Sequence, residues 1–98
     1  MTSAIDKVLK KLKLEDTGRY DDDFYIITLK DSNDYAKMYT QLDSLAVNTE
    51  FPTLDFNTSK TMTKTTNYFE IDVENIVYNI FLVADFAHDS YYIKIGEK

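Results

Sequence analysis

The 98-residue chain contains no cysteine and no tryptophan, and only two glycines, one proline and one histidine. Without cysteine it can form no disulfide, thiolate metal site or cysteine nucleophile. Two glycines disfavour a glycine-rich phosphate-binding loop, and neither G-x-S-x-G nor H-E-x-x-H occurs. A single histidine, His88, provides no pair for a zinc site. It stands beside Asp89, but no nucleophile can be placed nearby. We therefore predict no enzymatic activity, no catalytic residue, no cofactor and no metal.

Long hydrophobic runs are also missing. The longest apolar stretch, Ile76–Ala87, is interrupted by Asn79 and Asp85. It is shorter than the roughly 20 apolar residues that a membrane-spanning helix needs. The N-terminal residues lack the apolar segment of a signal peptide. We therefore expect a cytoplasmic protein that does not contact a membrane.

Acidic residues are in excess, and the net charge is −6. Residues 1–14 hold four lysines and one aspartate, for a net charge of +3, whereas the rest holds seven basic and sixteen acidic residues, for −9. An acidic body disfavours nonspecific binding to DNA or anionic membranes and favours a partner with a basic surface. Solubility alone is the simpler explanation of the same charge.

Helical periodicity occurs twice. Ile5, Val8, Leu9 and Leu12 share one face of a predicted helix over residues 3–14, with Ser3 as its N-cap. Its four lysines fall largely on the other side. We expect this helix to dock on a sheet, the alternatives being a membrane-surface helix or a nucleic-acid-binding arm. A second amphipathic helix is predicted over residues 32–46.

The remaining pattern is that of β-strands. Strands are predicted over residues 24–29, 53–56, 67–73 and 91–95, together with the Ile76 stretch. Glu74-Asn75 is predicted to be a tight turn. Thr61–Thr66 fits either a mobile loop or the exposed half of an edge strand. Residues 15–23 are predicted to be a loop, and its three consecutive aspartates lack the ligand spacing of a calcium loop.

This order of elements predicts one α+β domain over residues 1–98. The predicted architecture is a two-layer sandwich with two helices on one face of a four- or five-stranded, mostly antiparallel sheet that ends in a C-terminal meander. If the register is right, the open sheet face is rich in tyrosine and acid and carries Tyr68, Glu70, Asp72, Asn79, Asp85, Tyr92 and Lys94.

Tyrosine and aspartate cluster in two places that suit contact with a partner, since tyrosine is enriched in protein interfaces. The predicted partner-binding residues are Tyr20, Asp21, Asp22, Asp23, Tyr68, Glu70 and Asp72.

Small size, acidity and the lack of a catalytic set lead to one function hypothesis with two alternatives. The first is a protein-binding module that inhibits or modulates a nucleic-acid-processing enzyme by partial DNA mimicry, like the anti-defence and host-takeover proteins of phages and mobile elements. The second is an immunity or antitoxin-like protein that neutralises a basic toxin. The third is a structural or assembly subunit. We expect a protein partner, no direct nucleic-acid binding, and either a monomer or a homodimer.

Overall fold

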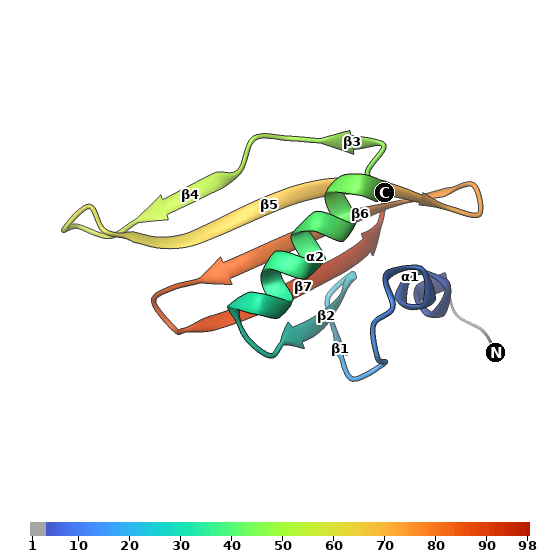
Figure 1. Ribbon diagram of the computed structural model, residues 1–98, viewed down its shortest axis with the longest axis horizontal. Helices are drawn as coiled ribbons and strands as arrows, with labels where there is room; N and C mark the ends of the chain where they lie inside the picture. Colours follow the sequence, from blue (N-terminus) through green and yellow to red (C-terminus); the bar gives the residue numbers. More distant parts are fainter. Residues whose placement is uncertain (1–3) are drawn as a thin grey trace.

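The computed structural model describes residues 4–98. Ser3, the predicted helix cap, lies outside the described residues. Two helices, α1 (Ala4–Leu12) and α2 (Ser32–Leu45), pack on a seven-stranded antiparallel sheet within this range (Figure 1). The strands are β1 (Arg19–Asp21), β2 (Phe24–Leu29), β3 (Asn48–Thr49), β4 (Thr53–Phe56), β5 (Met62–Val73), β6 (Ile76–Asp85) and β7 (Ser90–Glu97).

The strand order is β1-β2-β7-β6-β5, and β3 and β4 both pair with the outer edge of β5. The last three long strands form the predicted antiparallel meander. The α+β prediction is therefore confirmed, and the sheet has two strands more than expected. The additional strands are β1 and β3, which are three and two residues long and fully exposed. Neither is long enough to show an alternating pattern in the sequence.

β5 begins at Met62, five residues before the predicted strand. The segment Thr61–Thr66 is neither a mobile loop nor an edge, because from Met62 on it pairs with β4 and from Lys64 on with β6. The outer edge is β4, whose register shifts between Asp55 and Phe56. Glu74 and Asn75 form the predicted tight turn between β5 and β6, both with positive φ, as a type I′ hairpin turn requires.

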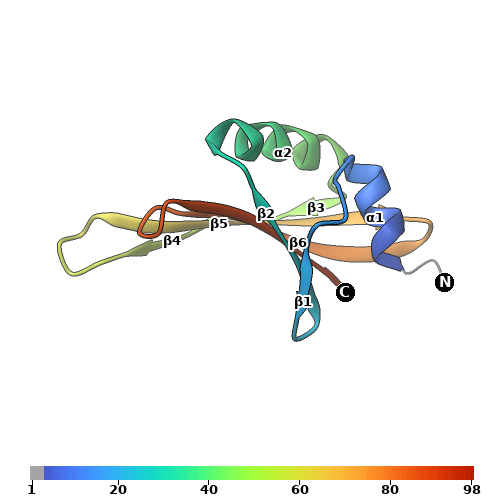
Figure 2. The same ribbon diagram turned by 90° about the horizontal axis from the view of Figure 1, so that it is seen from below.

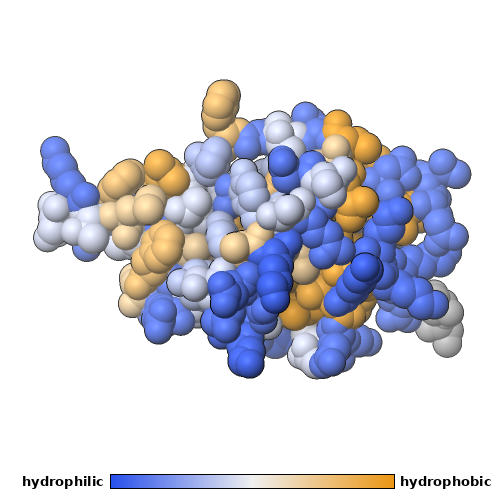
Figure 3. All heavy atoms as spheres, in the orientation of Figure 1, coloured by the Kyte–Doolittle hydropathy of each residue, from blue (hydrophilic) through white to orange (hydrophobic). Residues whose placement is uncertain are grey.

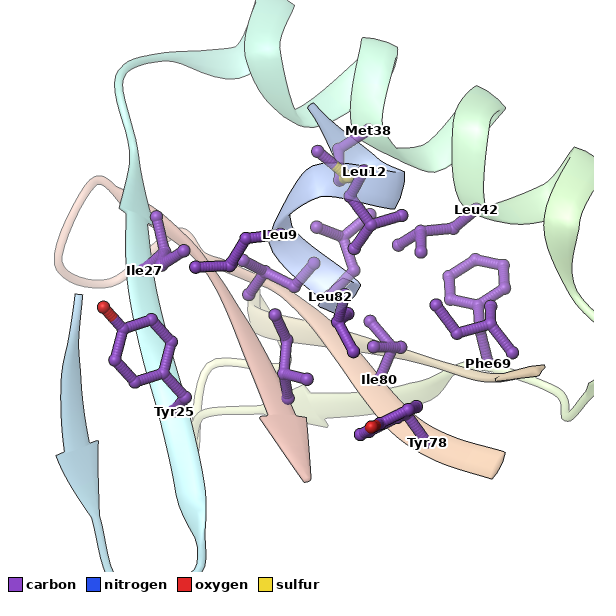
Figure 4. Close-up of a cluster of buried hydrophobic side chains, with 14 of the residues drawn as sticks. Leu9, Leu12, Tyr25, Ile27, Met38, Leu42, Phe69, Tyr78, Ile80 and Leu82 are labelled. Atoms are coloured by element: carbon purple, nitrogen blue, oxygen red, sulfur yellow. The ribbon is translucent and has the colours of Figure 1, made fainter. Parts of the chain in front are cut away.

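The core lies between the helices and one sheet face. Strand residues with their side chains on this face are buried, namely Tyr25, Ile27, Leu29, Phe69, Ile71, Val73, Tyr78, Ile80, Leu82, Ile93 and Ile95. From above, α1 contributes Val8, Leu9 and Leu12, and α2 contributes Met38 and Leu42 (Figure 4). The predicted apolar face of the first helix is therefore in the core and cannot lie on a membrane surface. No helix among residues 4–98 is long and apolar enough to cross a membrane.

The helices begin and end for local reasons. Asp31 caps α2 by accepting a hydrogen bond from the backbone N–H of Asp34 at 3.0 Å. Ala46, in an extended conformation, donates its N–H to the carbonyl of Leu42 and ends the helix. α1 is attached to the β5–β6 turn by an ion pair of 3.0 Å between Lys7 Nζ and Glu74 Oε2. Both partners of this pair are exposed, so it orients the helix more than it stabilises the fold.

The two layers differ in length. The twelve residues of β5 span about 40 Å, whereas the fourteen residues of α2 span about 21 Å. The molecule measures 47 × 26 × 26 Å, and its β4–β5 end extends past the helices (Figure 2). We call residues 51–66 the β4–β5 arm. Opposite the helices, the β1–β2 hairpin projects from the other side of the sheet (Figure 2). The sandwich therefore has two protrusions, at opposite edges of the sheet.

Replacing Ile80 with alanine is expected to lower the free energy of unfolding by about 3 kcal/mol. Ile80 is fully buried at the centre of β6, so its truncation leaves a cavity in the core. Urea unfolding followed by circular dichroism measures the change. Lys37→Ala on the exposed side of α2 is the control and should stay within about 0.5 kcal/mol of the wild type. Equal losses in both variants would contradict this account of the core.

Candidate functional site

The β1–β2 hairpin presents the first group of predicted contact residues, Tyr20, Asp21, Asp22 and Asp23. We call these four residues the acidic finger. All four are exposed, and Asp22 and Asp23 form the turn, since Asp21 pairs with Phe24. Asp22 has a φ of 55°, a conformation that aspartate tolerates better than most residues. None of the three carboxylates forms an ion pair within residues 4–98. The finger therefore displays three carboxylates without an ion pair in this range, and only Asp21 shares a surface pocket with the cations Arg19 and Lys94.

The base of the acidic finger is held by Tyr25. The N–H of Gly18 donates to the Tyr25 hydroxyl at 3.1 Å, and this hydroxyl donates to Asp16. The hydrogen bond to Asp16, together with burial, raises the pKa of Tyr25 above its usual value. The ring of Tyr20 packs edge-on against that of Tyr25, with centroids 5.0 Å apart. The chain entering the finger is thus fixed by buried contacts although its tip is free.

Gly18 is required by this geometry. A Cβ atom built on it would lie 2.3 Å from the carbonyl oxygen of Ile26 and 2.9 Å from the ring of Tyr25. A backbone carbonyl in a paired strand cannot move away without breaking the β1–β2 ladder. A side chain at this position would therefore displace the chain that leads into the finger.

The second group of predicted contact residues divides in the structure. Tyr68 and Glu70 lie on the open face of the sheet in one hydrogen-bond network. Tyr68 donates its hydroxyl to Asn79 Oδ1 at 2.5 Å and lies 3.1 Å from Glu70 Oε2. Glu70 also accepts a hydrogen bond from Asn48 Nδ2 at 3.1 Å, and its Oε1 forms an ion pair with Lys98 Nζ at 2.8 Å. Only 7% of the surface of Glu70 is exposed, and Lys98 neutralises its charge. The carboxylate is therefore not available to a partner.

The network shifts the ionisation of both residues. The ion pair with Lys98, followed by the hydrogen bond from Asn48, holds the pKa of Glu70 below its usual value of 4.5. Burial, followed by the hydrogen bond to Glu70, raises the pKa of the Tyr68 hydroxyl. At neutral pH the pair is therefore a carboxylate and a neutral phenol joined by a hydrogen bond.

Asp72 is separate from this network. It is exposed, and its Oδ1 accepts a hydrogen bond from the backbone N–H of Asn75 at 3.0 Å, which closes the β5–β6 turn. The acidic finger is also separate, because β2, β7 and β6 lie between β1 and β5. The predicted residues therefore divide into a projecting acidic finger, a neutralised polar network of Tyr68 and Glu70, and Asp72 at the β5–β6 turn.

The open face has the predicted register, and basic residues offset most of its predicted acidity. Tyr68 is paired with Phe81 and Phe81 with Lys94, which places them in one row across three strands. Four basic side chains share this face with six acidic ones. The basic residues are Arg19, Lys64, Lys94 and Lys98, and the acidic residues are Asp21, Glu50, Asp55, Glu70, Asp72 and Asp85. Counted over the whole face, the net charge is −2.

At the centre of the open face is an aromatic cluster that the sequence did not reveal. Phe81 packs against Phe24 and Tyr68, with ring centroids 5.5 and 5.1 Å apart. The Lys94 ammonium lies 4.7 Å from the centroid of Phe24, within the range of a cation–π contact. Gly96 is buried beneath this cluster. A side chain there would clash with the Phe24 ring, because a Cβ atom would lie 2.9 Å from it. The only sequence signal for this cluster was the mixture of apolar and polar residues on the second face of β6. It could not indicate which side chains of the neighbouring strands would contact Phe81.

The lone histidine lies in the turn after β6 and is paired with a carboxylate. His88 is exposed, and its Nδ1 lies 2.9 Å from Oδ2 of Asp85, not from its neighbour Asp89. This contact lowers the pKa of Asp85. Among residues 4–98, no three His, Asp or Glu side chains converge in a way that could hold a metal ion.

The chain matches no protein-family model, no curated protein and no solved structure in the comparisons made. The function must therefore be inferred from the surfaces described above.

Gly18→Ala is expected to lower the free energy of unfolding by about 2 kcal/mol, because the added methyl group overpacks against a backbone carbonyl. Thr17→Ala changes the adjacent exposed residue and serves as the control. Thermal and urea unfolding measure both variants. A Gly18→Ala protein as stable as the wild type would contradict the close packing at the base of the finger.

Glu70→Gln is expected to lower the free energy of unfolding near pH 7, and this loss should shrink as the pH falls below 4.5, the usual pKa of a glutamate. The pKa of Glu70 is lower in the folded than in the unfolded chain, so its stabilisation is present above about pH 4.5 and is lost as the pH falls through the folded pKa. Urea unfolding at a series of pH values tests this, with the exposed Glu15→Gln as control. A loss of stability that is the same at every pH would show that the charge of Glu70 is not what stabilises the network.

Proposed function

We propose that the protein is a non-catalytic binding module that inserts its acidic finger into a basic groove of another protein. The observation that supports this most strongly is the β1–β2 hairpin itself. It places Tyr20 and three unpaired carboxylates on a projection that is held at its base and free at its tip. A surface of this shape reaches into a groove, whereas a flat acidic patch would not.

Electrostatics favour the finger over the open face as the contact surface. On the open face, Glu70 is paired with Lys98, and Lys94 lies over the aromatic cluster. The finger forms no ion pair within the described part of the chain, and Asp22 and Asp23 at its turn are a local source of negative potential in a protein of net charge −6. Attraction of this kind increases the rate of association with a basic partner and decreases with added salt.

A nucleic-acid-processing enzyme is the class of partner that such a finger fits, because its groove is lined by cations that bind phosphates. Duplex DNA carries about one charge per 1.7 Å of axis, so three carboxylates match about 5 Å of duplex. The mimicry we propose is therefore local. The finger occupies one phosphate-binding position of the groove and blocks it, while the body of the domain prevents the nucleic acid from entering.

The same surface suits an immunity or antitoxin-like protein that neutralises a basic toxin. Both functions use the acidic finger, and they differ in the partner. Tyr20 supports either one, since its exposed ring adds apolar contact area at a small entropic cost beside the charges. Inhibition of a host enzyme and neutralisation of a toxin are distinguished by which protein is bound and inactivated.

The triple variant Asp21→Asn, Asp22→Asn and Asp23→Asn is expected to weaken partner binding roughly 30-fold without unfolding the protein. Asparagine keeps the size of each side chain and tolerates the positive φ of Asp22. The measurement is capture of proteins from the lysate of the source organism, followed by an activity assay and titration of the captured enzyme. We expect the wild-type domain to retain one basic protein in about 50 mM salt, to release it in about 500 mM salt, and to inhibit its activity.

A matched control removes the same number of charges elsewhere. The variant Asp43→Asn, Glu50→Gln and Asp89→Asn changes three exposed acids on α2, after β3 and in the β6–β7 loop. It should bind like the wild type. Equal weakening in both variants would mean that net charge and not the finger governs binding. Retention that is unchanged at high salt would overturn the electrostatic mechanism.

A further inference from the structure

The β4–β5 arm exposes a set of large apolar side chains. Phe51 is 97% exposed, Phe56 57%, Leu54 49% and Met62 37%. Every residue from 51 to 62 is exposed. Hydrophobic residues are visible at this end of the molecule, among weakly polar ones (Figure 3). Single exposed apolar residues are ordinary on a protein surface, but several on one projecting segment mark a contact surface.

The arm also ends in a free strand edge. The outer side of β4 has no strand neighbour within residues 4–98, because β4 pairs only with β5. Its four residues, Thr53–Phe56, include one charge, Asp55, which stands opposite Lys64 of β5. Edges are usually protected by lysine, proline or a covering segment. Pro52 precedes this strand and the register shift at Phe56 follows Asp55, so the edge is short but available for pairing.

The charge of the β4–β5 arm indicates which partner pairs with the free edge of β4. Residues 51–66 hold Asp55, Lys60 and Lys64, for a net charge of +1, so the rest of the chain carries −7. In an arm-to-arm contact only these two segments of small net charge come together, and the two acidic bodies, which repel each other, stay far apart. The basic partner proposed above is instead attracted to the acidic finger, which lies at the opposite edge of the sheet. The occupant that suits an apolar, nearly neutral edge on this chain is therefore a second copy.

We propose that two copies associate through their β4–β5 arms, with β4 antiparallel to β4 of the second copy across a two-fold axis. Centred on Leu54, this pairing places Leu54 opposite the same residue of the second copy and each Asp55 opposite a threonine, Thr53. The two sheets become continuous. Each Phe56 then lies opposite Pro52 of the second copy, once on either side of the two-fold axis, so that the contact is isologous.

The arm is large enough for such an interface. A stable interface buries about 800 Å² on each partner, which is about an eighth of the 6506 Å² of accessible surface here. Twelve consecutive exposed residues, four of them large and apolar, can supply an area of this size. The inference does not depend on the acidic finger or on the proposed partner.

Sedimentation velocity of the wild-type protein over a range of concentrations tests the proposal directly. We expect a monomer–dimer equilibrium. The double variant Leu54→Lys and Phe56→Lys should raise the dissociation constant of the dimer about 100-fold, because each change occurs twice in a two-fold interface. Ile76→Lys, at a residue 39% exposed in the β5–β6 turn region at the other end of the sheet, is the control and should dimerise like the wild type.

A second measurement uses the absence of cysteine from the chain. Leu54→Cys should form an intermolecular disulfide under mild oxidation, since directly opposed residues of paired strands have Cβ atoms about 5 Å apart. Ile76→Cys should not. A wild-type protein that stays monomeric at millimolar concentration would overturn the proposal, as would a folded lysine variant that dimerises normally. Neither of these results would affect binding through the acidic finger.

Discussion

Burial of one face of β6 is the constraint on which the rest of the structure depends. Tyr78, Ile80, Leu82 and Ala84 alternate along this strand and are all buried. A strand placed between β5 and β7 can bury that row only if helices cover the same face. The amphipathic faces of α1 and α2 meet this requirement, because both pack on that face of the sheet. Each of the two surfaces considered for binding is a region that this core does not reach.

The helices cover only part of the sheet, and this difference in length produces the β4–β5 arm. A helix rises about 1.5 Å per residue and a strand about 3.3 Å, so helices of nine and fourteen residues cannot cover a strand of twelve. The uncovered segment of β5 is rich in threonine, which tolerates exposure and favours extended backbone. The apolar residues at that end, Leu54 and Phe56, are on the added strand β4 and have no helix to pack against.

Prediction from the sequence succeeded where burial imposes a period and failed where it does not. The strand Phe24–Leu29, the helix ending near Leu45 and the Glu74-Asn75 turn all follow from local patterns, and so does the side of β6 that faces the core. The short strands β1 and β3 exist because neighbouring strands hold them in place, which no local pattern records. In the same way, Tyr68 and Glu70 were predicted as exposed contact residues, yet the C-terminal Lys98 neutralises Glu70 from 28 residues away. Pairing over such a distance depends on register and not on composition.

The two protrusions differ in charge and lie at opposite edges of one sheet. The acidic finger lies at the tip of the β1–β2 hairpin, at one edge of the sheet. The arm, with its net charge of +1, contains β4 at the opposite edge. If two copies pair through β4, the sheets join at the centre and both fingers lie at the outer ends of the assembly. A dimer of that form can engage two basic grooves, or two subunits of one symmetric enzyme. The second contact then forms at the high effective concentration set by a rigid sheet and not by a flexible linker. The arm would thus increase the affinity of the finger for a symmetric target without contacting that target itself.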